Sequence, residues 1–474
     1  MRGSSMRPHA RRISRRDLLR GTVAGLGGAL LSPLLLPCTR AHADPPPLMR
    51  LVAVEMNGAW DMLLSTDPRD PQRAYAGIAL GTDQLDARYQ TPRSTRVGRT
   101  GPFARDALLG STTGALAAHD DVLTLIRGLN MNTVSHPTGR AYMATGIGPA
   151  GSTPRGSSLG RALADAWIRS DAPPLLPHVA LGGLAFNRDY PDAASALSLS
   201  RASEVRDLLS QRRARRIPEE AVQNDLDALI AAARAARTMP AASLEAGPID
   251  PGTSEAQPSL ARALDEARAR LDRMDAEGLA TRFDFSTRTD LSTLYGDDLT
   301  RQTPSPALAA ATAARLITAP SDTEPALCAA VEVVLGTQLD THRDWATDQP
   351  AALQPAFDAL GAMLTDLRGS DPNLDHTLVI VHSEFGRSPM LNGSNGRDHH
   401  FASSMMLYGG GLVGGVFGAT GDQDLGLVAI DRATGLAHEG GVVLRPEDVF
   451  ATIASALGVD VSAYRAEPLP LVRT

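Results

Sequence analysis

The sequence predicts an α/β fold, in which helices cover both faces of a largely parallel sheet. Short apolar runs bounded by glycine or turn residues are typical of buried strands, and segments with helical periodicity lie between several of them. Strands that alternate with helices indicate parallel pairing, because each crossover returns the chain to the same end of the sheet. The chain has 474 residues, of which 43% are hydrophobic and 21% charged, so a disordered chain is excluded.

Apolar runs and periodic segments give the expected elements in order. The predicted strands cover residues 51–56, 122–126, 179–181, 331–335, 377–381 and 405–408. Two segments carry apolar side chains on one helical face, residues 350–367 and residues 446–457. The second begins with Pro446, followed by Glu447 and Asp448, which suit the first turn of a helix. A further helix is expected after the second strand.

The middle of the chain has a different composition. Residues 201–240 and 259–281 are rich in alanine, arginine and acidic side chains at helical spacing, and a segment rich in proline, glycine and serine near residues 246–258 joins them. We expect a helical insertion at about 198–290, within an α/β domain that spans residues 44–474. Its charged faces are typical of solvated helix surface.

The first 43 residues have the layout of an export signal. They contain eight arginines and one acid, and they run from Ser14-Arg15-Arg16-Asp17-Leu18-Leu19 through an apolar stretch to Ala41-His42-Ala43. A basic region, an apolar core and a small-x-small cleavage site make up a secretory signal, and the paired arginines before two leucines resemble the twin-arginine export motif. We therefore expect cleavage after residue 43, the twin-arginine translocase as a partner during export, and a periplasmic or secreted protein.

A membrane anchor is the alternative interpretation of this segment. Arg20, several glycines and Pro33 interrupt the apolar stretch of residues 18–36, which therefore falls short of the roughly 20 apolar residues that span a bilayer. We expect no stable membrane span. Removal of residues 1–43 leaves 38 basic and 52 acidic side chains, a net charge of -14 in place of the -7 of the full chain.

Composition excludes several classes of chemistry. All 46 basic residues are arginine, so lysine Schiff bases, P-loop lysines and lysine general bases are excluded. An acidic chain has little to offset phosphate repulsion, and we expect no nucleic-acid partner. The two cysteines, of which Cys328 alone follows the cleavage site, are too few for a disulfide scaffold or a cysteine-rich zinc module.

Polar side chains follow four of the predicted strands. In open α/β sheets, ligands bind beyond the carboxyl ends of the strands, so these segments are where a site is expected. They hold Asp61, then Ser135 and His136, then Asp340 and His342, and finally His382, Glu384, Asp398, His399 and His400. Carboxylates mixed with imidazoles suit Zn²⁺, Mn²⁺ or Mg²⁺, and two such ions can share ligands. The remaining histidines after residue 43 are assigned to no site: His119, His178, His376 and His438.

Several motifs follow one another in a recognisable order. They are Gly58-Ala59-Trp60-Asp61, Ser135-His136, Thr145-Gly146, Asp340-Thr341-His342, Ser383-Glu384-Phe385-Gly386-Arg387, Gly396-Arg397-Asp398-His399 and Arg445-Pro446-Glu447-Asp448. In this order they resemble the twin-arginine-exported domain-of-unknown-function 1501 family, which looks like a branch of the alkaline phosphatase and sulfatase superfamily. The resemblance spans nearly the whole chain after residue 43 and leaves the helical middle uncovered.

The resemblance implies an alkaline phosphatase-like sheet that binds two divalent metal ions, with Zn²⁺, Mn²⁺, Mg²⁺ and Ca²⁺ not distinguished. The positions that match metal ligands of the superfamily are Asp61, Asp340, His342, Glu384 and His399, with Asp398 beside the last. The nucleophile of the superfamily lies at a helix start before a Thr-Gly pair. That spacing points to His136 with Ser135 adjacent, and the choice between the two stays open.

The activity that the resemblance implies is metal-dependent hydrolysis of an anionic phosphate or sulfate ester. Arg140 or Arg387 would hold the anion through paired hydrogen bonds. The chain departs from the pattern at the nucleophile, where His136 replaces a hydroxyl residue. Two alternatives remain: a non-catalytic exported scaffold or surface-binding protein on the same fold, and a metal-free protein whose strand-end carboxylates pair with arginines.

Overall fold

A computed structural model describes residues 49–69, 92–170, 173–206, 279–297, 299, 304–319, 326–422 and 424–473. The expected export signal, residues 1–43, lies outside the described residues, and so do residues 207–278 of the expected helical insertion. Within the described part of the chain, no helix combines the length and the apolar character that crossing a bilayer requires.

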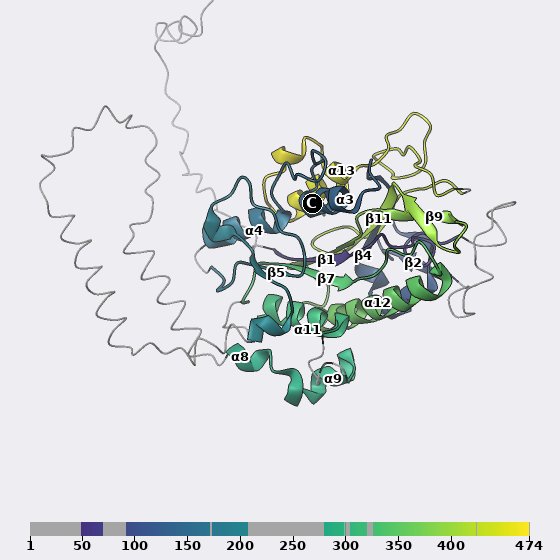
Figure 1. Cartoon of the computed structure of the whole chain (residues 1–474). Helices are drawn as coiled ribbons and strands as arrows, with labels where there is room; N and C mark the ends of the chain where they lie inside the picture. The colour runs from purple at the N-terminus through teal and green to yellow at the C-terminus, as the bar shows by residue number, and fades with distance from the viewer. Residues whose placement is uncertain are drawn as a thin grey trace, which may run out of the picture. The chain divides into compact units, whose positions relative to one another are not determined.

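The architecture is built on an eight-stranded sheet with the order β12-β4-β11-β8-β1-β7-β5-β6 (Figure 1). Its strands are β1 (Arg50–Met56), β4 (Leu123–Asn130), β5 (His178–Leu181), β6 (Leu197–Leu199), β7 (Ala330–Gly336), β8 (Thr377–His382), β11 (Ala402–Gly409) and β12 (Gly415–Gly418). All of them run in the same direction except β11, which pairs antiparallel with β4 and β8. The prediction of a largely parallel sheet is confirmed, and the six predicted strands correspond to β1, β4, β5, β7, β8 and β11.

Helices cover both faces of this sheet. Alternate side chains of β1 point to opposite faces, so that Val52 and Val54 join one buried core while Leu51 and Ala53 join the other. The first core lies under α11 (Pro306–Ile317), α12 (Trp345–Ser370) and η2 (Ser111–Val122), with α8 (Leu279–Arg282) and α9 (Thr289–Tyr295) beyond them. The second core lies under α3 (His136–Thr145), α4 (Leu159–Ile168) and α13 (Pro446–Ala456).

Helix α12 begins earlier than the sequence predicted. Its first residue is Trp345, and Pro350 and Pro355 lie inside the helix. A proline inside a helix lacks one hydrogen-bond donor and normally costs about 3 kcal/mol. The helical face that packs on the core includes Leu353 and Phe357, both fully buried, and this burial offsets that cost.

Two hairpins lie beside the main sheet. Strands β2 (Arg93–Val97) and β3 (Arg105–Leu109) form the first, and β9 (Gly386–Leu391) and β10 (Arg397–His400) form the second. The second hairpin follows β8 directly. It therefore places the histidines at the end of β10 near the carboxyl ends of β1, β7 and β8, which meet at one edge of the parallel sheet.

Candidate metal centre

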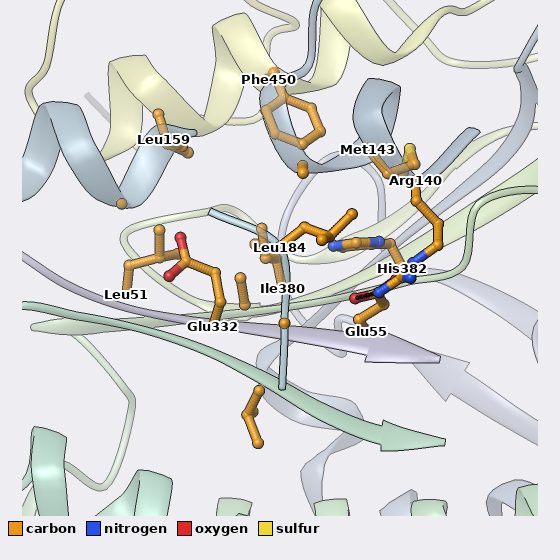
Figure 2. A pocket seen from close by; sticks show the side chains of 15 residues that line it. Leu51, Glu55, Arg140, Met143, Leu159, Leu184, Glu332, Ile380, His382 and Phe450 are labelled. Atoms are coloured by element: carbon orange, nitrogen blue, oxygen red, sulfur yellow. Dashed lines mark hydrogen bonds and ion pairs between the residues drawn. The ribbon is translucent and has the colours of Figure 1, made fainter. Parts of the chain in front are cut away.

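A small cavity on the sheet face under α3 and α4 holds several polar side chains (Figure 2). In its lining, Arg140 donates to Glu55, with Nε–Oε1 and Nη2–Oε2 distances of 2.5 and 3.1 Å. His382 lines the same cavity, and burial lowers its pKa to about 4. The free space is about 20 Å³, which suits one water molecule and excludes a substrate. Arg140, the expected anion holder, is thus occupied by a carboxylate of the protein.

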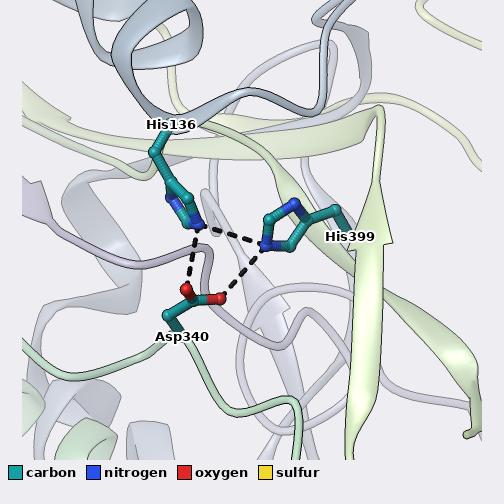
Figure 3. A group of neighbouring side chains, drawn as sticks. All are labelled: His136, Asp340 and His399. Carbon is teal, nitrogen blue, oxygen red and sulfur yellow. Dashed lines mark hydrogen bonds and ion pairs between the residues drawn. The ribbon is translucent and has the colours of Figure 1, made fainter.

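The strand-end residues that converge most closely are His136, Asp340 and His399 (Figure 3). His136 begins α3, Asp340 follows β7, and His399 lies on β10. One potential ligand atom from each lies within 4.8 Å of the others. The Nε2 atoms of the two histidines are 3.1 Å apart. His136 Nε2 lies 3.3 Å from Asp340 Oδ2, and His399 Nε2 lies 3.1 Å from Asp340 Oδ1.

His342 extends this cluster. Its Nε2 lies 3.0 Å from Asp340 Oδ1 and 3.0 Å from His399 Nε2. We call His136, Asp340, His342 and His399 the histidine–aspartate group. Three imidazole nitrogens that face one carboxylate at these distances cannot all donate to one another, because a neutral imidazole has one donor and one acceptor. A cation that accepts their lone pairs satisfies the arrangement.

The other ring nitrogen of each histidine is anchored. His136 Nδ1 lies 2.7 Å from Glu384 Oε1, and His342 Nδ1 lies 2.8 Å from Asp398 Oδ1. His399 Nδ1 lies 2.8 Å from the carbonyl oxygen of Val134. A proton on each Nδ1 leaves the Nε2 lone pair directed into the group. Metal-binding histidines commonly donate their second N–H to a carboxylate or carbonyl in this manner.

Glu384 is a buried carboxylate whose oxygens are all used. Oε1 accepts from the Gly58 backbone N–H at 2.9 Å as well as contacting His136, and Oε2 accepts from Ser383 Oγ at 2.9 Å. Burial favours the protonated form, but these hydrogen bonds, led by that of His136, lower the pKa of Glu384. In turn, the hydrogen bond to Glu384 raises the pKa of His136. Glu384, predicted as a metal ligand, contacts the Nδ1 atom of His136, on the side of the ring away from Asp340.

Asp340 is oriented by Arg387. The Arg387 side chain is fully buried and donates from Nη2 to Asp340 Oδ1 at 2.5 Å. Its remaining bonds go to the backbone carbonyl oxygens of Gly58, Ala59, Leu339 and Arg397. Burial alone would raise the pKa of Asp340, but the hydrogen bond and the charge of Arg387 lower it. Arg387, predicted to hold the substrate anion, is enclosed by protein acceptors.

Asp61, which was predicted as a metal ligand, has its described contacts outside the histidine–aspartate group. It is buried after β1, its Oδ1 accepts from the Leu63 backbone N–H at 2.7 Å, and its Oδ2 lies 3.3 Å from Arg397 Nη1. The Arg397 guanidinium also stacks 3.7 Å from the ring centre of Trp345. The structure therefore places Asp61 in a buried ion pair under the site.

Ser135 occupies the position just before α3. It is exposed, and its Oγ accepts a hydrogen bond from Thr138 Oγ1 at 3.3 Å. Among the described residues, its hydroxyl contacts no imidazole or carboxylate. Ser135 thus lies next to His136 at the amino end of a helix, where backbone N–H groups favour anions.

Two partners in the site were not assigned from sequence. The backbone carbonyl of Val134 holds His399, and any residue type supplies a carbonyl, so no sequence signal marks it. Asn392 donates from Nδ2 to Asp398 Oδ1 at 3.0 Å and to the His342 carbonyl at 3.1 Å. Its place between the two β-hairpin strands that flank the site is the signal that points to it.

Known structures resemble the chain only weakly. A protein named Ps i-CgsB, solved in complex with k-i-k-neocarrahexaose, is 8% identical, with a TM-score of 0.34 over 89% of this chain and 75% of that one. A Bacteroides thetaiotaomicron protein, described in connection with the metabolism of multiple glycosaminoglycans, is 9% identical, with a TM-score of 0.33 over 90% of this chain and 78% of that one. TM-scores this low carry no argument about function. No curated protein sequence matches the chain.

The match to a family model is extensive. The model described as "Protein of unknown function (DUF1501)" covers residues 49–469 and thus includes the whole histidine–aspartate group. The chain therefore belongs to the DUF1501 family of proteins of unknown function.

Proposed function

We propose that this protein is an exported metal-dependent hydrolase of phosphate or sulfate esters, on an alkaline phosphatase-like and sulfatase-like scaffold. The observation that carries the proposal is that three imidazole Nε2 atoms lie 3.0 to 3.3 Å from the Asp340 carboxylate, with every Nδ1 held by a carboxylate or a carbonyl. Structural ion pairs need no such ordered set of tautomers. Metal sites do, because each ligating nitrogen must present a lone pair.

The donor chemistry fits a transition-metal ion. Imidazole nitrogens with one carboxylate suit Zn²⁺ or Mn²⁺ better than Ca²⁺, which prefers an all-oxygen set. His136, Asp340, His342 and His399 would hold the ion, with Glu384 and Asp398 as their supports. Among the described residues, no second group of three histidine, cysteine or acidic side chains converges in this way. We therefore propose one ion at this group rather than the expected pair.

A bound ion at this place would polarise the ester oxygen of a substrate. The chain's own residues contribute positioning. Glu384 keeps His136 in one tautomer, and Arg387 keeps Asp340 ionised and fixed. The amino end of α3 attracts the anionic ester. Because both nitrogens of His136 are engaged, the hydroxyl of Ser135 is our proposed nucleophile in place of His136.

The test is metal analysis of natively purified protein, combined with hydrolysis of an aryl phosphate and an aryl sulfate. We expect about one ion per chain and turnover of one of the two esters. His399→Ala should lose both the metal and the activity, whereas His438→Ala, which removes an exposed histidine far from the group in sequence, should lose neither. A metal-free native protein would overturn the proposal. Bound metal without turnover would favour the non-catalytic scaffold.

We also propose that the chain is exported through the twin-arginine translocase. The support is the Ser14-Arg15-Arg16-Asp17-Leu18-Leu19 motif before an apolar stretch. Replacement of Arg15 and Arg16 together by lysine should retain the protein in the cytoplasm, as measured by cell fractionation. Unchanged export of that variant would contradict this route.

A further inference from the structure

A groove leads away from the histidine–aspartate group. Its first part has a volume of about 700 Å³ and is lined by Asp340, His342 and Arg343 at one end. Its second part, of about 390 Å³, shares Pro306, Leu335 and Thr337 with the first, so the two parts adjoin. A single phosphate or sulfate group would fill little of this space, because volumes of 300 to 1,000 Å³ are typical of sites for whole ligands.

The groove follows the carboxyl edge of the sheet. Its lining includes residues just after the ends of β1, β7, β5 and β6, which are neighbouring strands in the sheet order. Pro306 at the amino end of α11 and Ala352 and Pro355 in the first half of α12 add small apolar surfaces to the lining. This edge is where ligands of open α/β sheets bind. The groove thus extends the candidate metal centre toward β6.

The lining of the groove includes several polar side chains without a hydrogen-bond partner among the described residues. These side chains, which form no hydrogen bond with another described residue, are Asn57, Ser200, Ser203, Thr337 and Gln338. No phenylalanine, tyrosine or tryptophan belongs to the lining. Amides and hydroxyls favour a ligand that is itself rich in hydroxyl groups.

Two arginines add positive charge at separate points of the groove. Arg343 lines the first part beside His342, and Arg201 lines the second part beyond β6. Both are exposed, and neither forms an ion pair within the described part of the chain. The acids in the lining are Asp340, which belongs to the metal centre, and the exposed Asp348. These two arginines are the positive side chains that the lining offers to an anion.

We propose that the groove binds an extended, hydroxyl-rich chain that carries at least one anionic group besides the ester at the metal centre. Arg343 and Arg201 would pair with the additional anions, while the amide and hydroxyl side chains bind the hydroxyl groups between them. The proposal rests on the proposed function, since it places the reacting ester at the histidine–aspartate group. It names the substrate class as an extended polyhydroxylated polyanion.

The test measures binding of fluorescein-labelled dextran sulfate by anisotropy, with and without a metal chelator. The double variant Arg343→Ala/Arg201→Ala should bind this probe at least about tenfold more weakly than the parent. The variant Arg99→Ala, which removes an exposed arginine outside the groove, should bind it normally. Thermal unfolding of all three proteins checks that they are equally folded. Unlabelled neutral dextran should compete poorly, and poly-L-glutamate, a polyanion without hydroxyls, should compete less well than dextran sulfate.

The outcomes separate this inference from the proposed function. Equal affinity of the double variant and the parent for dextran sulfate would overturn the groove as the anion site. Competition by poly-L-glutamate as strong as that by dextran sulfate would overturn the requirement for hydroxyl groups. Arginine-dependent binding without hydrolysis of any ester would leave the groove standing and overturn the hydrolase.

Discussion

At the residue scale, the role of Glu384 separates two interpretations of the site. The sequence pattern assigned Glu384 to a metal, whereas the structure places its Oε1 on His136 Nδ1 at 2.7 Å. Glu384→Gln keeps the shape but removes the negative charge that holds the His136 tautomer. We expect the metal affinity to fall 10- to 100-fold, which is the usual cost of losing a partner of a ligating histidine. A competition titration with a chromophoric chelator measures it.

The comparison variant for Glu384→Gln is Asp398→Asn. Asp398 supports His342 in the same way, but 60% of its side chain is exposed, so solvent can replace it and the affinity should fall less. Complete loss of metal from Glu384→Gln, equal to that from His399→Ala, would show that Glu384 is itself a ligand.

From the sequence, Asp340, His342, His399 and His136 were expected at one edge of the sheet together with Asp61, and the structure brings the first four together without Asp61. The contact that each residue makes was not predicted. His136 follows β4, Asp340 and His342 follow β7, and His399 lies on the hairpin that comes after β8. Because β4, β7 and β8 run in the same direction, their carboxyl ends meet at one edge of the sheet. Whether Glu384 meets a metal or an imidazole depends on ångström-scale packing of β8 against α3. The burial of Arg387 depends on loop carbonyls of Gly58, Ala59 and Leu339, whose orientation no local pattern encodes.

At the element scale, the close approach of α3 to the end of β8 sets the position of His136. A Cβ added at Gly139 would lie 2.7 Å from the Glu384 carbonyl oxygen and 3.0 Å from Phe385 Cδ1. Gly139→Ala should therefore push α3 outward and destabilise the protein by about 1–3 kcal/mol. Because His136 lies on the same helix, metal affinity should fall as well. Urea unfolding and the chelator titration measure the two effects.

The control for Gly139→Ala is Gly369→Ala in α12. Nothing lies within 4 Å of the Cβ that this change would add, so the higher helix propensity of alanine should make it neutral or stabilising by up to about 1 kcal/mol. Equal stability of the two variants would show that the contact between α3 and β8 does not position the site.

Strands whose residues form an apolar run in the sequence were predicted, and strands made largely of polar residues were not. The six apolar runs became strands because each is buried on both faces of the sheet, which is what such runs indicate. The hairpin of β9 and β10 carries His399, yet its strands Gly386–Leu391 and Arg397–His400 are largely polar and have no alternating pattern. The start of α12 was placed late because proline usually marks a first helical turn.

At the scale of the whole molecule, a buried charge cluster joins distant parts of the chain. Asp67 follows β1, and its carboxylate pairs with Arg69 at 2.6 Å and with Arg127 of β4 at 3.3 Å, while Thr420 after β12 donates to it. Arg127 in turn donates to the Thr66 and Leu108 carbonyls. This cluster ties the first strand to the far edge of the sheet, so its protonation state should affect global stability.

The acid sensitivity of the fold follows from Asp67. Burial would raise the pKa of Asp67, but the charges of Arg127 and Arg69 lower it below its ordinary value. A carboxylate with a lowered folded pKa stabilises the protein at pH values above the unfolded pKa of about 3.9, and this stability is lost as the pH falls toward the folded pKa.

Asp67→Asn should cost about 3–5 kcal/mol at pH 7, because it leaves Arg127 buried without its counter-charge. The variant should then lose less additional stability than the parent between pH 5 and pH 3. Urea unfolding at both pH values measures the difference, and Asp106→Asn, whose exposed carboxylate lies 4.0 Å from Arg96, should follow the parent. Equal acid dependence of Asp67→Asn and the parent would contradict the assignment, since the metal-site residues titrate identically in both proteins.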